Sequence, residues 1–203
     1  MKTSFWKGKK IAVTGGGGFI GSHLVERLVS YGSIVTVVAS KSKRNQSHLS
    51  NVVSKIRWIE GDCRNLEDMK KACHRQDIVM NLAARVGGIE YNQMHQATML
   101  RDNLLIDTNV LEAARLEKVQ RFLVVSSACI YPRDCLVPTP ESDGFVGEPE
   151  STNGGYGWAK RMAEKLGMYY HEEFGMEIAI ARPYNCYGTR DHFEPEVAHV
   201  IPS

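Results

Sequence analysis

The sequence contains no apolar run that approaches the roughly 20 residues a membrane-spanning helix requires. Its first residues, MKTSFWKGKK, have no apolar signal core, since charge returns soon after Phe5 and Trp6. A net charge of only +2 provides no dominant sign with which to attract nucleic acid or a membrane surface. We therefore expect a cytoplasmic protein that binds neither nucleic acid nor a membrane.

Cysteine pairs of the CxxC type are absent, and the five cysteines show no disulfide-like spacing, which fits a reducing compartment. The seven histidines lack the spacing of metal ligands, so we expect no metal site. What remains is an ordinary globular composition, with 43% hydrophobic and 24% charged residues over 203 positions. This length suffices for one domain or slightly more.

Short β-branched runs alternate with segments of helical periodicity, and no internal repeat is present. Strands are expected at 10–14, 34–38, 56–59, 78–82, 122–126 and 178–181, and helices at 19–31, 66–74, 95–117 and 155–174. Residues 40–51 should form a loop or a short helix, and the proline-rich segment 132–153 a loop. The alternation predicts an α/β fold, a Rossmann-type doubly wound parallel sheet with helices on both faces.

The loop between the first strand and the first helix is rich in glycine, with Gly15, Gly18 and Gly21 at GxxGxxG spacing. Glycines let this backbone turn tightly and approach a pyrophosphate, whose charge meets the amino end of the helix. A glycine-rich turn can also be purely structural, but its place between strand and helix is the one that a dinucleotide site requires. The sequence therefore predicts a dinucleotide-binding domain.

The segment TGGGGFIGSHL resembles the extended branch of the short-chain dehydrogenase/reductase superfamily, in the NAD-dependent epimerase/dehydratase family. The pair Gly61-Asp62, the NLAA segment at 81–84 and Asn103 extend the resemblance over almost the whole chain. The resemblance implies a cofactor site that includes Gly15, Gly18, Phe19, Ile20, Gly21, Asp62, Leu82, Ala83, Ala84, Asn103, Ser126, Tyr156, Lys160 and Pro183.

The end of the second strand bears on the choice of cofactor. An acid at this place normally binds the adenosine ribose in NAD enzymes, and here no carboxylate follows Val38. Ser40, Lys41 and Arg44 follow instead and could hold the 2′-phosphate of NADP(H). The same residues could form a solvated basic loop. We expect NADP(H), with NAD as the alternative.

Tyr156 and Lys160 form a YxxxK motif, whose spacing puts both side chains on one face of a helix. A free tyrosine has a pKa of about 10, and a nearby lysine cation lowers this pKa toward the neutral range. A tyrosine and a lysine on one helix are more often a surface pair, but this motif follows the glycine loop and SSACIYP in the family's order. The resemblance implies that Tyr156, Lys160 and Ser127 are catalytic, with Ser127 hydrogen-bonding the substrate oxygen.

Three segments resemble the GDP-L-fucose synthase family and, more loosely, GDP-mannose 3,5-epimerases: SSACIYP at 126–132, AARVGGI at 83–89 and FEPEVAHVIP at 193–202. The resemblance implies that Cys129 and His199 are the acid/base pair that inverts a carbon beside a ketone. Inversion needs two groups on opposite faces, and thiol and imidazole both titrate close to neutral pH. A lone cysteine is otherwise usually a small buried residue.

The same resemblance, together with RPYNCYG at 182–188, implies a sugar-nucleotide site. Its expected substrate contacts are Val86, Gly87, Gly88, Ser127, Asn185 and His199.

We expect residues 1–185 to form the NAD(P)-binding Rossmann domain and 186–203 to begin a truncated substrate-binding domain, with weak or no turnover by this chain alone. A homodimer through the long helix and the YxxxK helix is expected from the resemblance. The implied function is a sugar-nucleotide epimerase/reductase that epimerises next to a 4-keto group and reduces it. Two alternatives remain: an epimerase that recycles NAD, and a non-catalytic dinucleotide-binding module.

Overall fold

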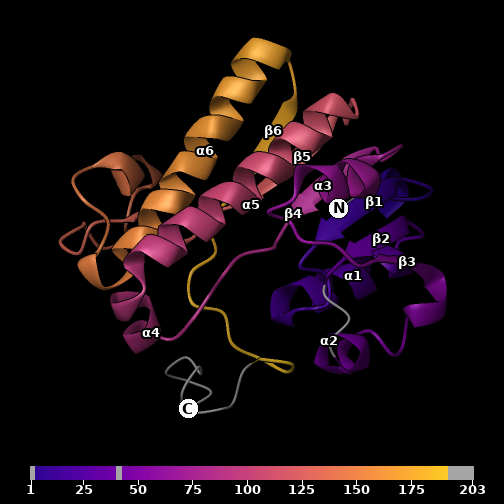
Figure 1. Cartoon of the computed structure of the whole chain (residues 1–203), viewed down its shortest axis with the longest axis horizontal. Helices are drawn as coiled ribbons and strands as arrows, with labels where there is room; N and C mark the ends of the chain where they lie inside the picture. The colour runs from indigo at the N-terminus through magenta and orange to yellow at the C-terminus, as the bar shows by residue number, and fades with distance from the viewer. Residues whose placement is uncertain (1–2, 40–42, 192–203) are drawn as a thin grey trace.

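The computed structural model of the chain describes residues 3–39 and 43–191, and six parallel strands form one sheet in this part of the molecule. The strands lie in the order β3-β2-β1-β4-β5-β6, which is the order of a doubly wound Rossmann sheet (Figure 1). Their bounds are β1 Lys10–Thr14, β2 Ile34–Val38, β3 Ile56–Ile59, β4 Ile78–Asn81, β5 Arg121–Val125 and β6 Glu177–Ala181. The predicted fold class is confirmed.

The helices are α1 Phe19–Ser30, α2 Lys43–His48, α3 Leu66–Cys73, α4 Ile89–Met94, α5 Gln96–Leu116 and α6 Gly154–Phe174. None of the helices described is long and apolar enough to cross a membrane. The predicted 95–117 helix corresponds to α5, but the short helix α4 before it was not predicted. His95 separates the two, with φ of −126° and ψ of 33°, which lies outside the helical region.

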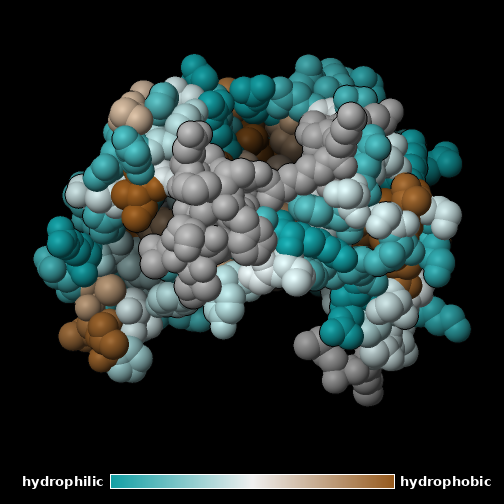
Figure 2. Space-filling model, turned by 90° about the horizontal axis from the view of Figure 1, so that it is seen from below, coloured by the Kyte–Doolittle hydropathy of each residue, from teal (hydrophilic) through white to brown (hydrophobic). Residues whose placement is uncertain are grey.

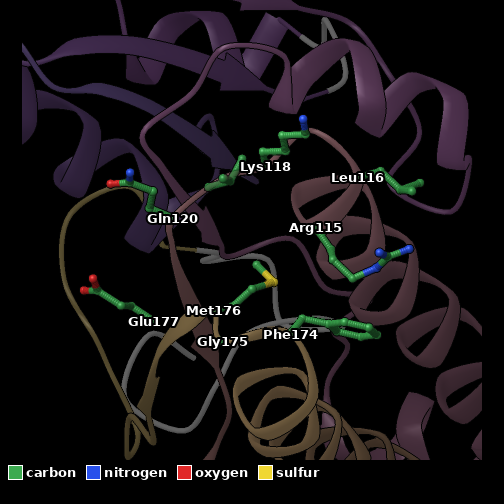
Figure 3. Close-up of a pocket in the computed structure, with 9 residues that line it drawn as sticks. Arg115, Leu116, Lys118, Gln120, Phe174, Gly175, Met176 and Glu177 are labelled. Atoms are coloured by element: carbon green, nitrogen blue, oxygen red, sulfur yellow. The ribbon is translucent and has the colours of Figure 1, made fainter.

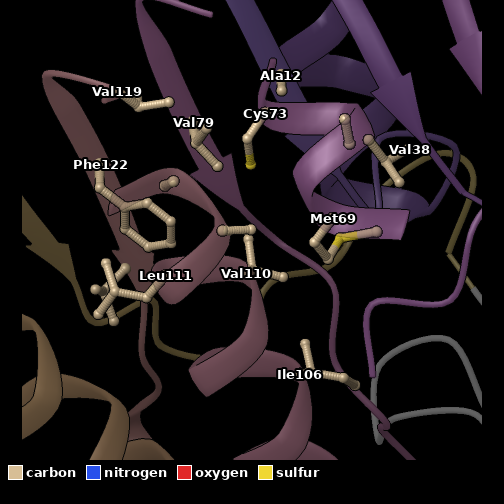
Figure 4. Close-up of a cluster of buried hydrophobic side chains, with 14 of the residues drawn as sticks. Ala12, Val38, Met69, Cys73, Val79, Ile106, Val110, Leu111, Val119 and Phe122 are labelled. Atoms are coloured by element: carbon tan, nitrogen blue, oxygen red, sulfur yellow. The ribbon is translucent and has the colours of Figure 1, made fainter. Parts of the chain in front are cut away.

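Alternating residues of the strands pack into two cores, one on each face of the sheet. Ala12 and Val79 face α3, α5 and α6, where Met69, Val110 and Leu111 are buried (Figure 4). The opposite face is covered by α1 and by the segment after α2, and its buried members are Ile11, Val13, Val25, Leu28, Val35, Val37, Leu49, Val52, Ile78 and Met80. Both faces of the central strands are therefore buried, as is usual for a parallel sheet.

The carboxyl ends of the parallel strands meet at one edge of the sheet, because every crossover returns to the same starting edge. The glycine loop follows β1 there, and the segment leading to α4 follows β4, at the lower end of the molecule in Figure 1. Seen from that end, a recess opens in the upper part of the view, with hydrophobic atoms inside it and hydrophilic atoms above it (Figure 2). Ligands of open α/β sheets bind at this edge.

Leu111 tests the packing of α5 on the sheet, since its side chain is only 1% exposed in the core shown in Figure 4. We expect Leu111→Ala to lower the free energy of unfolding by about 2–5 kcal/mol through lost burial and the cavity left behind. The matched control is Leu105→Ala on the same helix, where the leucine is 42% exposed and the loss should stay within about 0.5 kcal/mol. Equal losses in urea unfolding would contradict this assignment of the core.

Candidate active site

The loop after β1 is a tight backbone cradle. Gly15 has φ of +64°, and a Cβ placed there would lie 2.9 Å from the backbone of Leu82 and Ala83 at the end of β4. The Gly15 N–H donates to the Val38 carbonyl (2.9 Å), and the Gly18 N–H donates to the Gly15 carbonyl (3.0 Å). A glycine at position 15 is therefore required both by the positive φ and by the close approach to β4.

The amino end of α1 opens onto this cradle. Gly18 is its N-cap residue and supplies no side-chain hydrogen bond to the first helical N–H groups. These N–H groups, at the positive end of the helix dipole, can receive a phosphate. Of the other predicted contacts here, Phe19 is half-buried and Ile20 is 42% exposed.

At the end of β4, a chain of side-chain hydrogen bonds fixes the backbone that faces the cradle. The Thr14 hydroxyl donates to the Asn81 side-chain oxygen (2.5 Å) and accepts from the Ala83 N–H (3.1 Å). Leu82, Ala83 and Ala84 are all partly exposed beyond this anchor. Their predicted contact with the cofactor stays a prediction, and the structure gives them a fixed and accessible backbone.

Asp62 lies after β3 and is exposed, as a contact to an adenine ring requires. The Arg64 guanidinium donates to it (2.7 Å) and holds the pKa of this carboxyl below its ordinary value. Arg64 also approaches the buried Asp102 of α5 (3.5 Å), to which Arg85 donates at 2.8 Å. The carboxylate of Asp102 thus joins the loop after β3 to the loop after β4, an arrangement that the sequence analysis did not predict.

The loop after β4 carries the predicted substrate contacts. Asn103 is fully buried and pins this loop, because its side chain accepts from the Arg85 N–H (2.9 Å) and donates to the Arg85 carbonyl (3.0 Å). Val86 is 61% exposed, and Gly87 packs so closely on Tyr91 that a Cβ would lie 2.6 Å from the ring. A hollow of about 360 Å³ is lined here by Ala84, Arg85, Val86, Gly87 and Tyr91.

Ser126 and Ser127 follow β5 at the same edge. The Ser127 hydroxyl accepts from the Cys129 N–H (3.1 Å) and caps a single 3-10 turn, Ala128–Ile130. Ser126 is buried, and its hydroxyl has no hydrogen-bond partner among the residues described. A buried hydroxyl without a partner is costly, so a ligand group that accepts or donates there would be favoured.

Cys129 lies in this turn and is partly exposed. Burial raises the pKa of its thiol, although the Ser127 side chain opposes the shift. The protonated thiol is therefore the dominant form at neutral pH. The 3-10 turn approaches the start of α6 at Gly157, where a Cβ would lie 2.7 Å from Pro149 and closer still to the Cys129 carbonyl.

Tyr156 and Lys160 lie on one face of α6, as predicted, with the Lys160 ammonium 5.7 Å from the centre of the Tyr156 ring. Burial raises the pKa of the Tyr156 phenol, while Lys160 and the Ser127 hydroxyl lower it. Burial lowers the pKa of the Lys160 ammonium, but the Asp107 carboxylate outweighs burial and leaves this pKa above its ordinary value. Asp107 was not among the predicted site residues, although it lies 3.2 Å from the Lys160 ammonium.

Two arginines, the buried Arg161 and the partly buried Arg182, hold the turn that carries Cys129. Arg161, next to Lys160 on α6, donates to the carbonyls of Ile130 (2.9 Å) and Val146 (3.1 Å). Arg182 after β6 donates to the fully buried Glu164 (2.7 Å) and to the Tyr131 hydroxyl (3.0 Å). These contacts, which the sequence analysis missed, fix the irregular segment after β5 against α6.

The segment after β6 returns to the glycine cradle. The Pro183 carbonyl accepts from the Ala128 N–H (3.1 Å), Asn185 is exposed, and His23 of α1 contacts the Thr189 carbonyl at 2.9 Å. Ser40, Lys41 and His199 lie outside the described residues, and the side chain of Arg44 is likewise not described. The structure therefore brings together predicted residues from the ends of β1, β4, β5 and β6 and the start of α6.

A second hollow, of about 680 Å³, lies at the opposite end of the strands (Figure 3). No predicted site residue lines it; its lining is Arg115, Leu116, Lys118, Val119, Gln120, Phe174, Gly175, Met176 and Glu177. The predicted site residues that the structure describes lie at the other edge, which is where the candidate site is placed.

These features test whether a nicotinamide dinucleotide fits. The cradle at Gly15 has no room for a Cβ, the first N–H groups of α1 have no side-chain cap, and the Ser126 hydroxyl is buried without a partner in the described part of the chain. All three fit a pyrophosphate and ribose lying across the carboxyl edge of the sheet. The fold and site thus define a dinucleotide-binding protein of the short-chain dehydrogenase/reductase type.

The chain belongs to the NAD dependent epimerase/dehydratase family, whose model matches residues 11–203. It is 36% identical over 193 residues to GDP-mannose 3,5-epimerase 1 of Oryza sativa subsp. indica, covering 92% of this chain and 50% of that protein. It is 31% identical over 195 residues to GDP-L-fucose synthase of Escherichia coli (strain K12), covering 96% of this chain and 56% of that protein. The chain thus spans about half the length of these relatives.

Solved structures show the same framework. UDP-N-acetylglucosamine 4-epimerase from Methanobrevibacter ruminantium M1 has a TM-score of 0.84 at 26% identity, covering 97% of this chain and 61% of that one. A GDP-L-fucose synthetase from Naegleria fowleri has a TM-score of 0.76 at 25% identity, covering 96% and 55%. The family resemblance inferred from the motifs is confirmed.

We expect Gly15→Ala to weaken binding of NADPH at least about tenfold, because the added methyl group would push the cradle away from β4. Fluorescence titration of NADPH and of NADH measures the affinity. Gly8→Ala is the matched control, since Gly8 also has a positive φ (+76°) but open space around its Cβ. This control should lose about 1 kcal/mol of stability and keep its affinity. Unchanged affinity in Gly15→Ala would remove the cradle from the cofactor site.

Proposed function

We propose that the chain is the cofactor-binding part of an NAD(P)-dependent sugar-nucleotide epimerase/reductase similar to GDP-L-fucose synthases. Residues 1–185 would form the Rossmann domain, and 186–203 would begin the substrate-binding domain. The observation that carries the proposal is that Ser127, Cys129, Tyr156 and Lys160 lie close together at the edge of the sheet that also carries the glycine cradle. A serine, a phenol and an ammonium at this edge can polarise and protonate a carbonyl oxygen, and a thiol beside them can act on the neighbouring carbon.

The proposed cofactor is NADP(H), with NAD as the alternative. β2 ends at Val38 without an acidic residue at the adenosine ribose, and the sequence places Ser40, Lys41 and Arg44 after it. The backbone at Gly15, Gly18 and Gly21 would hold the pyrophosphate, and Lys160 the nicotinamide ribose. When bound, the nicotinamide would supply or accept the hydride at C4 of the sugar.

Tyr156 would give its phenolic proton to the C4 oxygen, with Ser127 donating a hydrogen bond to the same oxygen. Burial raises the pKa of the phenol, so Tyr156 carries its proton at neutral pH. A protonated phenol suits reduction of a ketone, because the oxygen needs a proton as the carbon becomes tetrahedral. The raised pKa therefore supports Tyr156 as the proton donor in the proposed reduction.

Cys129 would serve in the epimerisation that precedes reduction. Its raised pKa keeps the thiol protonated and suits it to return a proton to the carbon next to the ketone. The opposite face of that carbon needs a base, and His199 is our candidate for it. Polarisation of the ketone by Tyr156 and Ser127 would make the flanking C–H bonds acidic.

The proposed substrate is a nucleotide-linked 4-keto sugar, contacted by Val86, Gly87, Gly88, Asn185 and His199. The names of the relatives support a GDP-sugar, since the chain is similar to a GDP-mannose 3,5-epimerase and to GDP-L-fucose synthases. We further propose a cytoplasmic homodimer. Its support is a set of exposed apolar side chains on α5 and α6: Leu116, Trp158, Met162 and Phe174.

A second candidate function is an epimerase that oxidises C4 transiently and then restores it. The 36% identity to a GDP-mannose 3,5-epimerase favours this alternative. The two functions differ in net cofactor use, because a reductase consumes one NADPH per sugar and a recycling epimerase consumes none. Loss of NADPH absorbance with a GDP-4-keto-6-deoxy sugar therefore separates them.

In the proposed enzyme with its substrate-binding domain, we expect Tyr156→Phe to lower kcat by about 10²–10⁴-fold, since it removes the proton donor, while NADPH affinity stays within about twofold. Tyr169→Phe on the same helix, where the tyrosine is 57% exposed, is the control and should match the wild type. Steady-state loss of NADPH absorbance and equilibrium cofactor binding are the measurements. Retained activity in Tyr156→Phe would refute the catalytic role and leave a dinucleotide-binding module.

We expect Cys129→Ser to slow epimerisation by about 10²–10⁴-fold, because a hydroxyl is a far weaker acid/base group than a thiol. Reduction of the ketone should continue, since Tyr156 and Lys160 are untouched. The configuration of the sugar product, read by nuclear magnetic resonance, reports epimerisation, and NADPH absorbance reports reduction. Cys63→Ser, at a thiol whose pKa burial raises to about 12, is the control and should give the same product configuration as the wild type. Equal loss of both reactions in Cys129→Ser would contradict the separate role.

A further inference from the structure

A buried carboxylate lies directly behind the proposed catalytic pair. Asp107 of α5 is 5% exposed, and its Oδ2 is 3.2 Å from the Nζ of Lys160, which is 2% exposed. The Asn81 amide donates to the other oxygen of Asp107 at 2.7 Å. Two opposite charges in such a position are retained at a considerable desolvation cost, so the ion pair calls for a functional explanation.

The carboxylate is also the centre of a hydrogen-bond chain that reaches the cofactor cradle. Asn81 at the end of β4 accepts from Thr14 at the end of β1 (2.5 Å), and Thr14 accepts from the N–H of Ala83 (3.1 Å). The chain therefore runs from the cradle through Asn81 and Asp107 to Lys160. Its members come from β1, β4, α5 and α6, so Lys160 is positioned by the same groups that fix the end of β4.

We propose that Asp107 is a positioning residue for the Tyr156–Lys160 pair, whose carboxylate holds the Lys160 ammonium beside the phenol and compensates its charge, so that Tyr156 acts as a proton donor. The inference rests on the proposed function and deepens it, since it assigns to Tyr156 the role of proton donor and not that of base. An uncompensated ammonium would pull the phenol toward phenolate, which is the form that a base needs. Burial raises the pKa of the Asp107 carboxyl, and the Lys160 ammonium at 3.2 Å opposes this rise, so the two groups compensate each other's charge only as a pair.

The groups that face Tyr156 agree with this assignment. Lys160 and Ser127 stabilise its phenolate, whereas Cys129 from the turn after β5 and Asp107 from α5 oppose ionisation. Cys63, from the loop after β3, is the other thiol close to Asp107 and is itself protonated. Asp107 is the carboxylate in this set, so its removal changes the local charge by one unit.

The experiment is a titration of the Tyr156 phenol by ultraviolet phenolate absorbance in the purified chain, with Tyr156→Phe subtracted to isolate the signal. In Asp107→Asn we expect the Tyr156 titration to move to lower pH by about one unit or more, because the amide keeps the hydrogen bond from Asn81 and removes the charge. Asp102→Asn is the control, since Asp102 is equally buried on the same helix but pairs with arginines. It should leave the titration unchanged.

A merely structural Asp107 predicts lower stability without a shift in the phenol titration. The same Tyr156-dependent absorbance in wild type and Asp107→Asn at every pH therefore overturns the proposal. If Asp107→Asn does not fold, Asp107→Thr removes the same charge and keeps a hydroxyl that can accept from Asn81, and the same two outcomes apply. Asp107→Glu, which retains the charge, should restore the wild-type titration.

The titration needs neither substrate nor turnover, so its outcome is separate from that of the proposed function. A shifted phenol in a protein that reduces no sugar supports the role of Asp107 and removes the reductase assignment. An unshifted phenol titration in an active reductase removes the role of Asp107 and supports the reductase assignment.

Discussion

The close approach between the loop after β1 and the end of β4 is the constraint on which the rest of the site depends. Gly15 lies so near the backbone of Leu82 and Ala83 that no side chain fits between them. Hydrogen bonds of the Thr14 hydroxyl to Asn81 and to Ala83 hold the two strand ends together. Adjacent parallel strands deliver both ends to one edge, but their register alone does not set the relation of the loops. The buried hydrogen bonds do so, and they continue to Asp107 and Lys160.

The second constraint is that the turn after β5, which carries Cys129, is irregular and must be held by side chains. A single 3-10 turn has little stability of its own, so Arg161 and the Arg182–Glu164 pair anchor the surrounding carbonyls and hydroxyls. Both arginines are attached to elements that also carry predicted site residues. Positioning of Cys129 and positioning of Tyr156 are therefore coupled through α6, which makes the site one unit and not a set of independent side chains.

The sequence predicted the regular part of the molecule well because strong local signals agree with the tertiary structure there. The strands at 10–14, 34–38 and 56–59 have the bounds that were predicted, and the glycine loop lies where the motif places it. The helix α4 was missed because six residues are too few for periodicity to show. The short 3-10 turns within 132–153 were not predicted either, since they depend on contacts from residues far along the chain, such as Arg182 at Glu141 and Gln96 at Ser151.

Asp107 was missed because an acidic residue in a helix usually faces solvent. A signal was present, since Asp107 lies four residues after Asn103 and three before Val110, on the same face of α5 as two buried positions. An acid on a buried face requires a cation, and the YxxxK lysine was the available one. Its identity as the partner could not be read from the sequence, because the pairing of α5 with α6 is tertiary.

The framework does not by itself determine which nucleotide is recognised. A protein named for a UDP-sugar and one named for a GDP-sugar share this framework at TM-scores of 0.84 and 0.76. In the proposed function the cradle holds the pyrophosphate of the cofactor, and Ser127, Tyr156 and Lys160 act on a sugar carbonyl or hydroxyl, a group that all nucleotide sugars have in common. Discrimination between bases must then arise from segments that reach beyond this edge. Two exposed segments of the described residues lie on the side of the proposed sugar site: the loop at Val86 and the segment at Asn185. Both are placed to contribute to the discrimination between bases.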